Sequence, residues 1–151
     1  MNPVDATNTI LVVAEESDTR IFLSNLLRSG GFTPVSATTM AQGLQRARAG
    51  RPNLIILDVM MPNKEGIRMY HHLKNDTALK AIPVIMLSAI DRETFFLYER
   101  FQSTQKRSGL PKPDAYLEKP PEADELIRLA RSLTRPGEKD AAAVAHEVTT
   151  T

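Results

Sequence analysis

The sequence predicts an α/β fold in which five parallel strands form one doubly wound sheet between two layers of helices. Short apolar runs of strand length, rich in β-branched residues, recur along the chain, as is typical of strands buried on both faces. Helical patterns separate these runs, and parallel strands need such crossover connections. The 151 residues have the size of one domain that can bury a real core.

Apolar runs and turn signals place the individual elements. Strands are expected over residues 9–14, 33–37, 53–58, 82–89 and 114–119. Ser17 or Asp18 is expected to cap the first helix, and Thr39 the second, with Gln42 at the capping-box position. The other helices are expected over about residues 65–74, from near residue 91, and along the apolar stripe between residues 126 and 133.

Composition narrows the class of protein and its organisation. The net charge of +1 does not mark a nucleic-acid binder, and the absence of cysteine excludes a disulfide framework or thiolate metal site. No apolar run has membrane-spanning length and no signal-peptide core precedes the domain, so a cytoplasmic protein without membrane contact is expected. We expect an N-terminal extension over residues 1–8, a domain over 9–135, and a flexible tail or linker stub over 136–151.

Polar residues stand where four of the predicted strands end. Asp58 follows the third strand, Glu15 the first, Ser88 the fourth and Lys119 the fifth. Taken alone, Asp58 could simply begin a turn, since aspartate is common there. The carboxyl ends of parallel strands meet at one edge, however, so all four side chains are expected in one pocket. Carboxylates are ligands for Mg²⁺, and a lysine and a hydroxyl can hold phosphoryl oxygens.

From about Thr9 to Arg135 the chain resembles the receiver domains of bacterial response regulators, in particular the chemotaxis-regulator-like ones of two-component signalling. The residues that carry the resemblance, in order, are Asp58, Pro62, Gly66, Ser88, Tyr116, Lys119 and Pro120. The resemblance implies a flavodoxin-like three-layer sandwich with strand order 2-1-3-4-5. It also implies a cis peptide bond before Pro120.

The same resemblance implies a function. Asp58 would accept a phosphoryl group from a histidine kinase or a phosphotransfer protein, and Ser88 and Lys119 would contact the phosphoryl oxygens. Ser88 and Tyr116 would act as the switch that changes protein contacts. Such a chain is a signalling switch with at most weak self-catalysed dephosphorylation, not an enzyme that turns over a separate substrate.

A Mg²⁺ cofactor is implied as well, held by Glu15, Asp58 and the backbone carbonyl of Met60, with Glu16 as a further candidate. Family members usually carry two acidic residues after the first strand, and here Ala14 occupies the first of these positions. Alanine cannot orient a metal-bound water, and Mg²⁺ demands near-octahedral geometry, so a lower metal affinity is expected. The alternative is therefore a phosphorylation-independent pseudo-receiver that acts as a protein-interaction module.

Segment 91–113 is longer than the corresponding part of related receivers and holds many of the aromatic residues. In the family, helix four, strand five and helix five form the output face, so this face and the segment are expected to bind a downstream protein, and a homodimer is one expected arrangement. Phe95 and Phe96 are expected in the core, because apolar side chains on helices are mostly buried. Tyr98 and Phe101 are the candidates for partner contacts.

Overall fold

The computed structural model describes residues 8–91, 93–95 and 111–134. The strands are β1 (Thr9–Val13), β2 (Thr33–Ala37), β3 (Leu54–Asp58), β4 (Val84–Ser88) and β5 (Ala115–Glu118). The helices are α1 (Ser17–Ser29), α2 (Met40–Gly50), α3 (Glu65–Lys74) and α5 (Ala123–Thr134), with a 3₁₀ turn η2 (Pro62–Lys64) before α3. Residues 93–95 are also helical.

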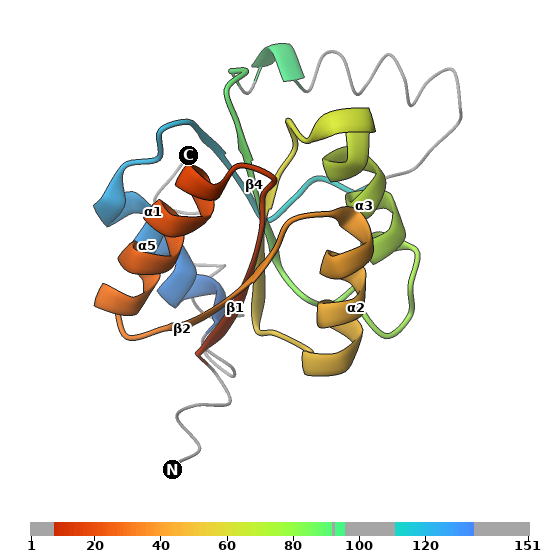
Figure 1. Ribbon diagram of the computed structural model, residues 1–151, viewed down its shortest axis with the longest axis horizontal. Helices are drawn as coiled ribbons and strands as arrows, with labels where there is room; N and C mark the ends of the chain where they lie inside the picture. The colour runs from red at the N-terminus through yellow and green to blue at the C-terminus, as the bar shows by residue number, and fades with distance from the viewer. Residues whose placement is uncertain (1–7, 92, 96–110, 135–151) are drawn as a thin grey trace.

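The five strands form one parallel sheet in the order β2-β1-β3-β4-β5. Helices α1 and α5 lie on one side of this sheet, and α2 and α3 lie on the other (Figure 1). The predicted fold class and strand order are therefore confirmed. A sheet covered on both faces has no solvent-facing side, which explains why the strands read as continuous apolar runs.

Alternate residues of each strand point to opposite faces and divide the core into two layers. On β1, Leu11 and Val13 belong to the layer under α2 and α3, and Ile10 and Val12 belong to the layer under α1 and α5. All four side chains are almost completely buried. In β1, β3 and β4 the interior positions are all apolar and buried, and the polar residues lie at the strand ends.

Helix ends follow the sequence signals in one case and depart from them in another. Thr39 caps α2 as predicted, because its hydroxyl accepts a hydrogen bond from the backbone amide of Gln42 at 3.1 Å. The predicted cap of α1 was wrong: Ser17 already lies within the helix, and the N-cap residue is Glu16, whose side chain makes no capping bond. A residue inside the helix cannot supply the cap, since capping needs extended backbone geometry at that position.

The region after β4 is described only in part. Asp91 accepts a hydrogen bond from the backbone amide of Thr94 at 2.7 Å, which lowers the pKa of Asp91 and begins the fourth helix as predicted. Phe95 is buried, as expected, with its ring centroid 5.1 Å from that of Tyr116. The expectations for Phe96, Tyr98, Phe101 and both chain ends concern residues outside the described ranges.

Tyr70 on α3 forms a hydrogen bond to the segment that leads into β5. Its side chain is buried, and its hydroxyl donates to the carbonyl oxygen of Pro111 at 2.7 Å. Burial, and to a smaller extent the charge of Asp114, raises the pKa of Tyr70, so the phenol remains a hydrogen-bond donor. Among the described helices, none is both long and apolar enough to cross a membrane.

Candidate functional site

The ends of β3, β4 and β5 are held in register at the carboxyl edge of the sheet. Val59 donates its backbone amide to the carbonyl oxygen of Leu87 at 3.0 Å, and Lys119 donates its own to that of Ser88 at 2.8 Å. Asp58 lies beside Leu87, the residue before Ser88. The Lys119–Pro120 peptide bond is cis, as the resemblance implied. The sheet thus brings Asp58, Ser88 and Lys119 to one place, as predicted.

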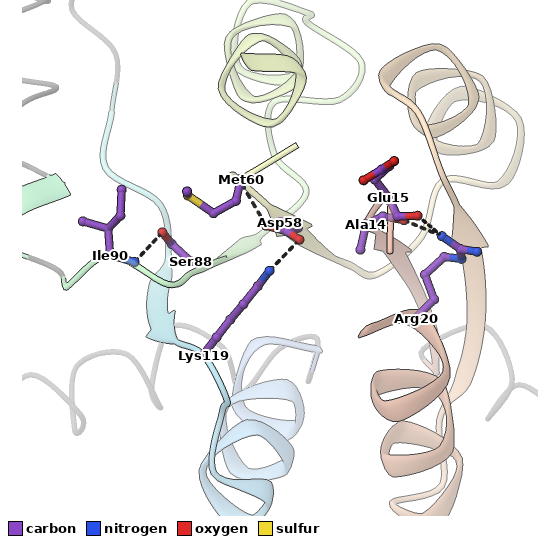
Figure 2. A network of polar contacts seen from close by, with 8 residues as sticks. All are labelled: Ala14, Glu15, Arg20, Asp58, Met60, Ser88, Ile90 and Lys119. Carbon is purple, nitrogen blue, oxygen red and sulfur yellow. Dashed lines mark hydrogen bonds and ion pairs between the residues drawn. The ribbon is translucent and has the colours of Figure 1, made fainter. Parts of the chain in front are cut away.

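Asp58 is only 4% exposed, and both of its carboxylate oxygens have partners. Oδ1 accepts a hydrogen bond from the backbone amide of Met60 at 2.8 Å, and Oδ2 forms an ion pair with Nζ of Lys119 at 2.8 Å (Figure 2). Burying a carboxylate is costly unless it is paired and hydrogen-bonded. The two contacts meet this condition and fix the direction in which the carboxylate points.

Gly66 allows α3 to begin directly against the backbone of Asp58. A Cβ atom at this position would lie 2.3 Å from the carbonyl oxygen of Asp58 and 2.6 Å from Cα of Val59. The chain enters α3 through Asn63 and Lys64, which both have positive φ angles, 59° and 57°. The short turn between Asp58 and α3 is therefore tightly constrained, and this path of the backbone requires glycine at position 66.

Ser88 and Tyr116 are connected through the backbone of Ile90. The hydroxyl of Ser88 accepts a hydrogen bond from the amide of Ile90 at 3.0 Å, and the hydroxyl of Tyr116 donates to the carbonyl oxygen of Ile90 at 2.6 Å. Ser88 and Tyr116 are both buried. A rotation of the Ser88 side chain would break the first bond and free the residue that anchors Tyr116. The sequence alone does not reveal this connection, because it runs through the backbone atoms of Ile90.

The turn after β1 is organised by an arginine that sequence reasoning missed. Nη1 of Arg20 donates to the backbone carbonyl oxygens of Ala14 and Glu15 at 2.9 Å and 2.6 Å (Figure 2). Ala14 is fully buried, whereas the side chains of Glu15 and Glu16 are exposed. The signal in the sequence was the position of Arg20 in the first turn of α1, from which a long side chain can reach back over the preceding turn.

The described residues do not form a complete site for the implied Mg²⁺. No three His, Cys, Asp or Glu side chains come together in a way that could hold a metal ion, within the part of the chain that the structure describes. Ala14 has no side-chain oxygen to offer, and Oδ2 of Asp58 is paired with the ammonium group of Lys119, a cation that would lie close to a bound metal. Mg²⁺ requires octahedral oxygen coordination and gives up water reluctantly. The donor set of the described residues therefore fits a magnesium ion poorly, and the metal affinity expected from Ala14 stays a prediction.

Comparison with known proteins identifies the family. Residues 10–131 match the family model described as "Response regulator receiver domain". The chain belongs to this family. It is 31% identical over 126 residues to the phosphate regulon transcriptional regulatory protein PhoB of Escherichia coli, with 83% of this chain and 51% of PhoB covered. It is 25% identical to protein PilH of Pseudomonas aeruginosa, with 78% of this chain and 91% of PilH covered.

Solved structures agree with this assignment. The receiver domain of the Francisella response regulator 1452 superposes with a TM-score of 0.69 at 27% identity, covering 84% of this chain and 96% of that one. The Vibrio cholerae chemotaxis protein CheY4 superposes with a TM-score of 0.67 at 22% identity, covering 83% and 97%, which supports the fold alone. The chain spans about half the length of PhoB. Receiver domains are switches of two-component signalling rather than enzymes with a separate substrate.

Proposed function

We propose that this receiver domain accepts a phosphoryl group on Asp58 from a phosphohistidine donor and changes its protein contacts in response. The observation that carries the proposal is the ion pair between Asp58 and Lys119 at the carboxyl edge of the sheet. In this pair a buried carboxylate, which would act as the nucleophile, lies beside a cation suited to phosphoryl oxygens. The donor would be a histidine kinase or phosphotransfer protein of a two-component system.

In the proposed reaction an oxygen of Asp58 attacks the phosphorus atom of the donor. A bond forms between this oxygen and phosphorus, the bond from phosphorus to the donor nitrogen breaks, and the electron pair stays with the imidazole. Negative charge is spread over the phosphoryl oxygens in the transition state, so a fixed cation favours it. Lys119 is the cation in contact with Asp58, and the amide of Met60 holds the other carboxylate oxygen in place.

The response would run through Ser88 and Tyr116. A phosphoryl group on Asp58 offers strong acceptor oxygens, and the Ser88 hydroxyl would turn to donate to one of them. Ser88 would then release the amide of Ile90, whose carbonyl oxygen accepts the bond from Tyr116. Tyr116 is on β5 and contacts Phe95, so the shift would reach the face of helix four, β5 and α5. We propose this face, segment 91–113 included, as the site for a downstream protein or a second copy.

The proposal predicts a gain of one phosphoryl group that depends on Asp58. The protein would be incubated with a small phosphodonor, such as phosphoramidate, over a range of Mg²⁺ concentrations, and its intact mass measured. We expect the gain in the parent protein and none in Asp58→Asn, which keeps the shape of the side chain but removes the charged nucleophile. An equal gain in both proteins, or none from this donor and none from a phosphohistidine protein, would contradict the proposal.

Two apolar side chains at the mouth of the site predict slow loss of the phosphoryl group. Met60 is 47% and Ile90 37% exposed, and both flank the site (Figure 2). Neither side chain can orient an attacking water. The double variant Met60→Asn, Ile90→Glu should therefore lose phosphate at least about tenfold faster, which is less than the roughly 100-fold at the low end of what a well-placed general base contributes.

The rate would be followed by intact mass after removal of the donor. Met60→Leu, Ile90→Val is the matched control, because it changes the same two residues but leaves an apolar side chain at both positions. A polar double variant that releases phosphate no faster than this control would rule out the explanation.

A phosphorylation-independent interaction module is the second candidate, favoured by the incomplete metal site around Ala14. If it is correct, Asp58→Asn should leave the affinity for the downstream protein unchanged, with or without a phosphodonor. If Asp58 is the phosphoacceptor of a switch, the donor should change this affinity in the parent protein only. Binding measurements with both proteins would therefore separate the two functions.

A further inference from the structure

We infer that Ala14 makes this receiver a weak binder of divalent cations, so that its acidic pocket does not hold Mg²⁺ on its own at millimolar concentrations. The inference concerns the pocket of the proposed function and deepens it. Metal affinity is measured directly, however, without phosphorylation. Failure of this inference and failure of Asp58 as a phosphoacceptor are therefore distinguishable.

The first argument is the supply of oxygen ligands. Ala14 is fully buried and directly follows Val13, which pairs with Leu57, the residue before Asp58, so a methyl group stands at the position of β1 that is next in register with Asp58. Glu15 is the nearest remaining acid, and its side chain is exposed rather than buried in the pocket. Figure 2 shows the carboxylate of Glu15 separate from the pair formed by Asp58 and Lys119. A cation would thus find one anchored carboxylate and one that must be ordered at an entropic cost.

The second argument is the charge around these ligands. Lys119 forms an ion pair with Asp58, and the guanidinium of Arg20 lies against the carbonyl oxygens of Ala14 and Glu15. A divalent cation beside Glu15 would compete with Lys119 for the carboxylate of Asp58. It would also be repelled by the charges of both Lys119 and Arg20, since like charges at short range raise the energy. The exposed acids Glu16 and Asp18 offset this only in part, because solvent and salt screen charges on the surface.

The test is a calorimetric titration of the full chain with MgCl₂, with the shift in thermal unfolding as a second readout. We expect no saturable binding by the parent protein at millimolar Mg²⁺. Ala14→Asp should raise the affinity at least about tenfold, the usual worth of a residue that supports a metal ligand. Ala14→Asn is the matched control, because it adds similar volume to the buried site without a charge, and it should bind no better than the parent.

Two outcomes would overturn the inference. One is saturable binding of Mg²⁺ by the parent protein below millimolar concentration, which requires no variant and decides the matter even if Ala14→Asp does not fold. The other is a folded Ala14→Asp protein that binds Mg²⁺ no more tightly than Ala14→Asn. The parent titration also stands independently of the phosphodonor experiment, since a protein that never accepts a phosphoryl group still gives a metal affinity.

Discussion

Gly66→Ala is expected to destabilise the fold by about 3 kcal/mol, the upper part of the usual range for overpacking a tight site. The added Cβ would lie 2.3 Å from the carbonyl oxygen of Asp58 and 2.6 Å from Cα of Val59. Both atoms belong to the backbone, so no change of rotamer can make room. Either the start of α3 or the end of β3 has to move. Movement of β3 is opposed by the hydrogen bonds that join it to β4.

Thermal unfolding would measure this effect, with an expected decrease in Tm of roughly 10 °C for a domain of this size. Gly50→Ala is the matched control, because a Cβ there would meet nothing within 4 Å and the residue lies at the end of α2. It should be neutral or slightly stabilising, since alanine favours helix over glycine. Equal stability of the two variants would show that α3 is free to shift away from Asp58.

The fold could be predicted from the sequence because its strongest signals are repeated and agree with one another. Four of the five strands are apolar runs of the right length, and each crossover carries helical spacing, so the order of the elements leaves little choice. Strand ends were less certain: β4 begins at Val84, two residues later than expected, because Pro83 has no amide to donate to the sheet. The predicted cap of α1 was wrong because several successive polar residues can each start a helix, and the structure begins it one residue earlier, after Glu16.

The site could be predicted in part, for reasons that differ between its residues. Asp58, Ser88 and Lys119 follow buried strands, and parallel pairing alone brings such positions to one edge. Arg20 and the connection of Ser88 to Tyr116 through Ile90 were missed, because both depend on hydrogen bonds to backbone atoms, which residue type does not reveal. The role of Glu15 as a metal ligand remains a prediction, because the side chain is exposed and no packing fixes its direction.

Lys119→Met is expected to reduce phosphoryl uptake at least about 100-fold, as the loss of a charged group that stabilises a transition state commonly does. Methionine keeps much of the aliphatic length of lysine but removes the ammonium group that lies 2.8 Å from Asp58. The initial rate of mass gain from phosphoramidate would measure the change. A stability loss of about 2 kcal/mol should accompany it, because Asp58 is buried and loses a charged hydrogen-bond donor.

A double-mutant cycle separates the ion pair from packing changes around residue 119. In the Asp58→Asn background the ammonium group of Lys119 no longer has a carboxylate to neutralise. Lys119→Met should therefore lower the free energy of unfolding by at least about 1 kcal/mol less there than in the parent protein. Chemical denaturation of the parent, both single variants and the double variant provides the coupling. If the two losses simply add, Lys119 stabilises the fold through its aliphatic chain alone. A slow phosphoryl uptake in Lys119→Met would then reflect a disturbed pocket rather than a missing charge.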